Sequence, residues 1–107
     1  MSRFAEVLAR LSAVVESRKG GDPSASYTAK LLADPSLSAK KLGEEAIETV
    51  IAATKGEPDA LAAESADLIY HWLVVLAAAG VSLDEVAAKL EAREGTSGLV
   101  EKASRTS

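Results

Sequence analysis

KLGEEAIETVIAATKGEPDALAAESADLIYHWLVVLAAAG, the stretch from Lys41 to Gly80, predicts a hairpin of two long helices. Both halves carry apolar residues at helical spacing, and Lys55-Gly56-Glu57-Pro58 between them is typical of a tight turn. We expect the first helix to run from about Leu37 to Thr54 and the second from about Asp59 to Ala79. A short connection between long helices favours antiparallel packing.

The chain before this hairpin predicts one further long helix and a short helical turn. Apolar residues recur at intervals of three and four from Phe4 to Val15, and Gly20-Gly21 is expected to stop that helix. The turn is expected over Tyr27 to Leu32, with Asp34-Pro35 breaking it. No segment carries a convincing strand pattern.

The chain after the hairpin predicts a last helix that ends near Arg93. Ser82-Leu83-Asp84-Glu85 has the spacing of a capping box, which begins a helix. We therefore predict an all-α protein, an antiparallel helical bundle of about four main helices over residues 1–94. Residues 95–107 are expected to form a flexible tail, because they begin with Gly95-Thr96-Ser97-Gly98 and stay polar.

Composition limits the classes of function. The 107 residues include 48% hydrophobic but only 4% aromatic residues, so the core must be thin and a homodimer is expected. A net charge of −4 argues against a nucleic-acid partner, and the absence of cysteine excludes disulfides and thiolate metal ligands. The longest apolar run, Trp72 to Val81, is too short to cross a membrane, and no signal-peptide pattern is present. A cytoplasmic location is expected.

Five carboxylates stand out on the hairpin. Glu44, Glu45 and Glu48 share one sector of the first helix, and Glu64 and Asp67 lie one turn apart on the second. Like charges at this spacing destabilise a helix by roughly 0.2–0.5 kcal/mol per pair. Mg²⁺, or Mn²⁺ as an alternative ion, would offset that repulsion because both prefer carboxylate oxygens.

The apolar pattern of the first hairpin helix predicts which side packs. Its apolar face is expected to consist of Leu42, Ala46, Ile47, Val50 and Ile51, with the acids on the other side. A single Glu-Glu-x-x-Glu is most often only a solvated face. The second acid pair argues for more, because it borders the most apolar helix of the chain, where unpaired carboxylates are costly.

Four further segments extend the acid pattern: Ser26-Tyr27-Thr28-Ala29-Lys30-Leu31-Leu32, Lys41-Leu42-Gly43-Glu44-Glu45-Ala46, Ala66-Asp67-Leu68-Ile69-Tyr70-His71 and Gly80-Val81-Ser82-Leu83-Asp84-Glu85-Val86. With these segments the chain resembles the all-α nucleotide pyrophosphohydrolases of the MazG-like superfamily. Within it, the chain is similar to the phosphoribosyl-ATP pyrophosphatase family of histidine biosynthesis. The resemblance covers nearly the whole chain, and the acid positions show no departure from it.

The resemblance implies a reaction and a set of site residues. The reaction is the Mg²⁺-dependent hydrolysis of phosphoribosyl-ATP to phosphoribosyl-AMP and pyrophosphate, the second step of histidine biosynthesis. Metal-binding and catalytic roles are implied for the five acids, Glu44, Glu45, Glu48, Glu64 and Asp67. Substrate contacts are expected from Tyr27, Thr28, Lys30, Lys41 and His71. Which carboxylate, if any, acts as a general base stays open.

Three alternatives compete with this interpretation. A housekeeping pyrophosphohydrolase acting on free nucleoside triphosphates would use the same acids. A non-catalytic helical interaction module would bind no Mg²⁺. A di-iron carboxylate bundle usually has Glu-x-x-His pairs, but Leu68 stands three residues before His71, so this option is the weakest.

Overall fold

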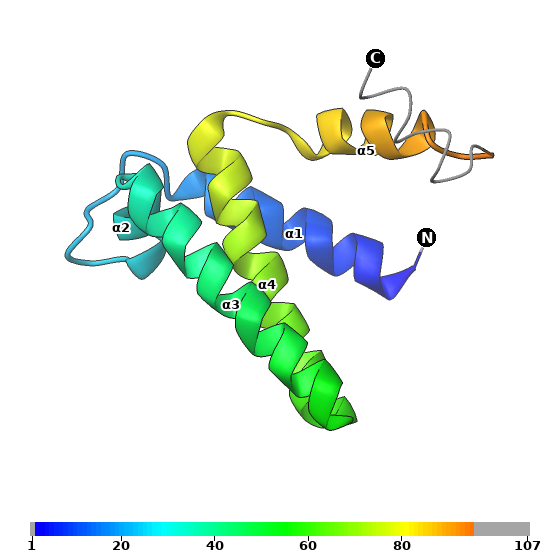
Figure 1. The fold of residues 1–107 in the computed structure, drawn as a ribbon. Helices are drawn as coiled ribbons and strands as arrows, with labels where there is room; N and C mark the ends of the chain where they lie inside the picture. The colour runs from blue at the N-terminus through cyan, green and yellow to red at the C-terminus, as the bar shows by residue number, and fades with distance from the viewer. Residues whose placement is uncertain (1, 96–107) are drawn as a thin grey trace, which may run out of the picture.

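The computed structural model describes residues 2–95 and shows, over that range, helices joined by short loops and no strand (Figure 1). In chain order the helices are α1 (Arg3–Ser17), α2 (Tyr27–Leu32), α3 (Pro35–Lys55), α4 (Pro58–Ala79) and α5 (Leu83–Glu91). The all-α prediction is confirmed. The predicted tail lies outside the described residues, apart from Gly95.

The predicted hairpin is the main feature of the fold. α3 and α4 run antiparallel and side by side, and α1 and α2 pack against α4 toward the end of the hairpin away from its turn (Figure 1). Gly56 ends α3 with φ +67°, and Gly80 ends α4 with φ +72°. Glycine takes this left-handed conformation without steric cost, so both helices stop where the sequence predicts.

α3 begins two residues earlier than expected. The Asp34 side chain accepts a hydrogen bond from the Leu37 N–H at 3.1 Å, and Pro35 occupies the first turn. Aspartate is a favoured N-cap, and proline has no N–H to leave unpaired at that position. The Asp34-Pro35 pair therefore ends α2, as predicted, and also begins α3.

The hydrophobic core is small. Its buried centre consists of Val15 from α1, Leu31 from α2, and Val74 and Ala77 from α4. Tyr70 is among the half-buried side chains that pack against it. The core thus lies around the second half of α4, whereas the acids lie nearer the turn of the hairpin.

The predicted apolar face of α3 is wrong in part. Ile47 and Val50 are 63% exposed and Ile51 is 47% exposed. Glu45 is half-buried instead and Ala52 is buried, so the side of α3 that packs on α4 includes part of the acidic sector. The periodicity located the most apolar side of the helix correctly, but no other element within residues 2–95 covers that side.

α5 stands apart from the packed helices. The predicted capping box is confirmed, because the Glu85 N–H donates to Ser82 Oγ at 3.1 Å and the Ser82 N–H donates to Glu85 Oε2 at 2.6 Å. The helix ends at Glu91, slightly before the expected Arg93, and none of its residues is buried. Figure 1 shows it extending away from the hairpin.

The length and composition of α4 resemble those of a membrane-spanning helix. Among the described helices it is the one long and apolar enough to cross a membrane by length and composition, and it is longer than the apolar run from Trp72 to Val81, which extends past its end at Ala79. That criterion is weak, because core helices of soluble proteins meet it too. α4 carries Glu64 and Asp67 and packs along α3.

Candidate metal centre

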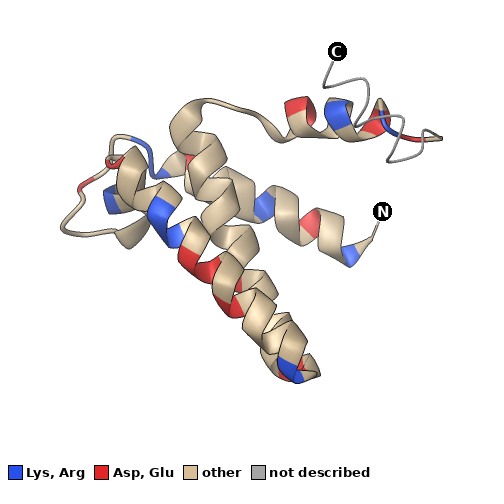
Figure 2. Ribbon diagram, in the orientation of Figure 1, with Lys and Arg blue, Asp and Glu red and all other residues tan. Residues whose placement is uncertain are grey.

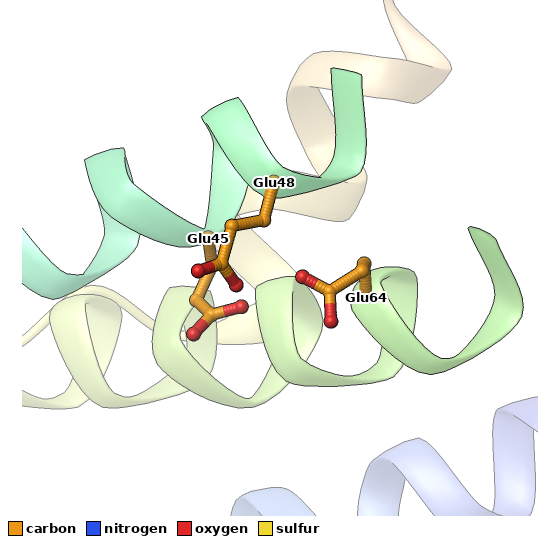
Figure 3. A group of neighbouring side chains, drawn as sticks. All are labelled: Glu45, Glu48 and Glu64. Atoms are coloured by element: carbon orange, nitrogen blue, oxygen red, sulfur yellow. The ribbon is translucent and has the colours of Figure 1, made fainter. Parts of the chain in front are cut away.

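The hairpin brings three of the five predicted acids together. Glu45 and Glu48 lie one turn apart on α3, and Glu64 lies opposite them on α4. Figure 3 shows their carboxylates converging between the two helices. One carboxylate oxygen from each lies within 4.8 Å of the others. We call these three residues the carboxylate cluster.

The other two predicted acids occupy different positions. Asp67 lies outside the cluster but near it, since its negative charge raises the pKa of both Glu45 and Glu64. Glu44 points elsewhere and forms an ion pair with Lys41, with 3.3 Å between Nζ and Oε1. Figure 2 shows basic residues of α3 directly before the acidic ones. The structure thus separates Glu44 from the cluster.

The acids of the cluster raise one another's pKa. A hydrogen bond with Glu48, partial burial and the surrounding negative charges raise the pKa of Glu64 to about 7, from an ordinary 4.5. Burial is the main cause that raises the pKa of Glu45, followed by the charges of Glu48 and Asp67. The metal-free cluster therefore holds a proton on Glu64 up to about neutral pH.

The donor set of the cluster fits a hard divalent cation. Glu45 Oε2 is buried and accepts no hydrogen bond from any described residue. The two ion pairs found within residues 2–95, Lys19–Glu16 and Lys41–Glu44, leave the cluster without a basic partner. Carboxylate oxygens at this spacing are ligands typical of Mg²⁺ or Mn²⁺, and a cation would give the buried oxygen its missing partner.

Thr49 fixes the spacing of the two helices at the cluster. Its hydroxyl donates to the backbone oxygen of Glu45 at 2.8 Å and lies 3.3 Å from the backbone oxygen of Glu64. One side chain thus joins the α3 and α4 backbones at the two positions that carry cluster residues. Thr49 was not predicted as a site residue, because a threonine inside a helix gives no sequence signal of a contact with another helix.

Comparison with known proteins adds the family. The model of the family "Phosphoribosyl-ATP pyrophosphohydrolase" matches residues 8–94. The chain belongs to this family. A protein named phosphoribosyl-ATP pyrophosphatase from Caulobacter sp. (strain K31) is 72% identical over 107 residues, covering 100% of both chains. Proteins of the same name from Caulobacter vibrioides (strain NA1000 / CB15N) and Cereibacter sphaeroides (strain KD131 / KCTC 12085) are 74% identical over 103 residues and 60% identical over 100 residues. The matches cover 96% of both chains in the first case, and 92% of this chain and 97% of the relative in the second.

In this member of the phosphoribosyl-ATP pyrophosphohydrolase family, some of the predicted substrate residues are exposed and others already contact protein side chains. Tyr27 is 51% exposed and Lys30 is also exposed, so both are accessible to a ligand. Lys41 is engaged by Glu44 at one end of the acidic sector. The Thr28 hydroxyl is engaged too, by the hydroxyl of Tyr70 on α4 at 2.5 Å. Ser26 caps α2 by accepting the Ala29 N–H.

His71 lies beside the cluster in this family member. Its Nδ1 lies 2.9 Å from the backbone oxygen of Asp67, one turn earlier on α4. A positive charge on the imidazole would lower the pKa of Glu45, so the ring is close enough to act on the cluster electrostatically. Tyr70, whose ring contacts His71, belongs to one of the segments that carry the family resemblance, but it was not predicted as a site residue.

Proposed function

We propose that the chain hydrolyses phosphoribosyl-ATP to phosphoribosyl-AMP and pyrophosphate, as a soluble cytoplasmic enzyme of the second step of histidine biosynthesis. The observation that carries the proposal is the carboxylate cluster of Glu45, Glu48 and Glu64, found between the hairpin helices of a member of this family. The curated relatives are named for the same substrate and reaction type.

The proposal includes Mg²⁺, with Mn²⁺ as an alternative. Glu45, Glu48 and Glu64 would hold the ion, and Asp67 lies near enough to add a ligand or a negative charge. The bound ion would supply positive charge that offsets the repulsion between an acidic site and a triphosphate and stabilises the leaving pyrophosphate. Glu44 stays a predicted ligand that would have to leave Lys41 to take part.

The reaction needs a proton acceptor, which the cluster supplies. Water forms a new P–O bond as the anhydride bond between the α- and β-phosphates breaks, and the proton lost by water must be taken up. A carboxylate whose pKa lies near the working pH is suited to this task. The pKa of Glu64, about 7 in the metal-free cluster, would fall when a cation binds there, so the acceptor would be a carboxylate of the site that the ion does not fully engage.

We also propose that the enzyme is a homodimer. Ile47, Val50 and Ile51 form an exposed apolar strip along α3, and Phe4 and Leu90 are about 60% exposed on α1 and α5. Burying one such side chain contributes roughly 1.5–3 kcal/mol. A second copy of the chain would bring the same apolar strip against this one, which compensates for the thin core.

The test of the proposed function is the turnover of phosphoribosyl-ATP compared with that of dATP and dCTP in the presence of Mg²⁺. We expect clear preference for phosphoribosyl-ATP, and large losses of activity in Glu45→Gln, Glu48→Gln and Glu64→Gln. Glu91→Gln, an exposed residue of α5, is the matched control and should keep full activity. Preference for dATP or dCTP would favour the housekeeping alternative. Active-site variants without effect would favour a non-catalytic module.

A further inference from the structure

Two hydroxyl groups far apart in sequence meet between α2 and α4. Thr28 Oγ1 and the Tyr70 hydroxyl oxygen lie 2.5 Å apart, and both side chains are half-buried. The Tyr70 ring also packs against the core of Val15, Leu31, Val74 and Ala77. The ring therefore contacts the core with its apolar surface and α2 with its hydroxyl, and both contacts restrict its position.

The fixed ring contacts the imidazole of His71. The two ring centroids lie 4.9 Å apart with an interplanar angle of 83°, an edge-to-face arrangement. The imidazole also places Nδ1 2.9 Å from the backbone oxygen of Asp67. Two contacts thus set the orientation of the imidazole, and Nε2 is the ring nitrogen that no described residue engages.

The imidazole held in this way lies at the edge of the carboxylate cluster. Asp67, whose backbone oxygen it contacts, is near Glu45 and Glu64, and Glu45 senses charge on His71. The chain of contacts runs from Thr28 through Tyr70 to His71 and ends at the backbone oxygen of Asp67.

We propose that Thr28 and Tyr70 are positioning residues, whose hydroxyl–hydroxyl hydrogen bond sets the Tyr70 ring so that the ring holds His71 Nε2 available to the substrate beside the carboxylate cluster. The inference rests on the proposed function, because it assigns these residues to the same reaction. It also changes the role expected of Thr28. The hydroxyl of Thr28 acts through Tyr70 rather than through a direct contact with substrate.

Direct binding and positioning predict different kinetics. A Thr28 that touches phosphoribosyl-ATP would give a higher KM when its hydroxyl is removed, whereas Tyr70 would be unaffected. A Thr28 that acts through Tyr70 gives the same kinetic change as Tyr70 itself, because both substitutions break one hydrogen bond. Removing both hydroxyls together then adds nothing further.

The experiment measures kcat and KM for phosphoribosyl-ATP with Mg²⁺ in Thr28→Val, Tyr70→Phe and the double variant. Each substitution removes a hydroxyl and nearly keeps the shape of the side chain. We expect kcat to fall about tenfold in all three, as for other residues that orient a functional group. KM should change by less than about twofold, because substrate binding is not the step affected. Thr28→Ser should restore the wild-type kcat.

Two controls separate positioning from loss of structure. Thr54→Val removes a threonine hydroxyl that bonds only to the Val50 backbone oxygen of its own helix, and it should leave kcat unchanged. In a His71→Ala background, adding Tyr70→Phe should not lower kcat further, because the residue being positioned is gone. A purely structural effect would lower the unfolding temperature and would persist in that background.

The outcomes separate this inference from the proposed function. A wild-type protein that does not hydrolyse phosphoribosyl-ATP refutes the proposed function. A wild-type protein that does, together with unchanged kcat in Tyr70→Phe, refutes the positioning role alone. Multiplying losses in the double variant, or a higher KM confined to Thr28→Val, would also overturn it.

Discussion

The affinity of the enzyme for Mg²⁺ is expected to weaken about tenfold between about pH 8 and about pH 6. The pKa of Glu64 is raised to about 7, so the metal-free cluster holds a proton below that pH, and the ion must displace it. For one competing proton the apparent Kd is multiplied by a factor of roughly 1.1 at pH 8 and roughly 11 at pH 6.

Glu48→Gln tests the cause of this pH dependence. The hydrogen bond that protonated Glu64 donates to the Glu48 carboxylate is the largest of the effects that raise the pKa of Glu64, and Glu48 also contributes negative charge. A glutamine amide would instead donate to the ionised form of Glu64, so the pKa of Glu64 should fall toward its ordinary value. The remaining pH dependence should be roughly twofold or less, while affinity at high pH also weakens because a ligand is lost.

Isothermal titration calorimetry in buffers of different ionisation enthalpy gives both the affinity and the protons released. Near pH 6 the wild type should release about one proton per ion bound, and near pH 8 almost none. Glu91→Gln, which removes an exposed carboxylate of α5, should behave as the wild type does. An affinity that stays constant from pH 8 to pH 6, with no proton release, would refute the coupled cluster.

Other predictions follow from single contacts and exposures. The pKa of Glu64 is about 7 in the folded protein and 4.5 ordinarily. Protonated Glu64 therefore stabilises the folded state fully below about pH 4.5, and this stabilisation is lost as the pH rises through about 7. The metal-free protein should therefore melt at a lower temperature at pH 8 than at pH 5, and Glu64→Gln should reduce that difference. Val50→Asp should weaken the dimer at least about 100-fold in sedimentation experiments, because Val50 is 63% exposed in one chain. A stable wild-type monomer at micromolar concentration would contradict the dimer itself. Gly43→Ala should raise the free energy of unfolding by up to about 1 kcal/mol, since an added Cβ meets no atom within 4 Å. Thr49→Val should weaken Mg²⁺ binding roughly tenfold, and Thr49→Ser should restore it; equal affinity in all three proteins would show that the bond between α3 and α4 does not set the site.

Local sequence signals predicted most of the helices. Ser82 and Glu85 satisfy each other's backbone groups, so the start of α5 follows from four consecutive residues. Gly56 and Gly80 likewise end α3 and α4 by their own conformational freedom. The predicted start of α3 was two residues too late. Asp34-Pro35 both ends α2 and caps α3, and the prediction used only the first of these roles.

Tertiary features were harder to predict for identifiable reasons. The acids of α3 and α4 come together because they lie at similar distances from the hairpin turn, one set before it and the other after it. These distances can be counted in the sequence. Ile47, Val50 and Ile51 belong to the predicted apolar face of α3, yet they are exposed. The sequence could not predict this, since periodicity shows which side of a helix is apolar but not which element covers it. The bond between Thr28 and Tyr70 spans 42 positions, and nothing in either local segment indicates it.

The most direct test of the account is a crystal structure of the enzyme with Mn²⁺ and a non-hydrolysable phosphoribosyl-ATP analogue. The anomalous signal of Mn²⁺ locates the ion independently of the protein model. The account predicts an ion held by oxygens of Glu45, Glu48 and Glu64, with the triphosphate reaching the same ion. An ion and triphosphate bound away from the space between α3 and α4 would contradict it.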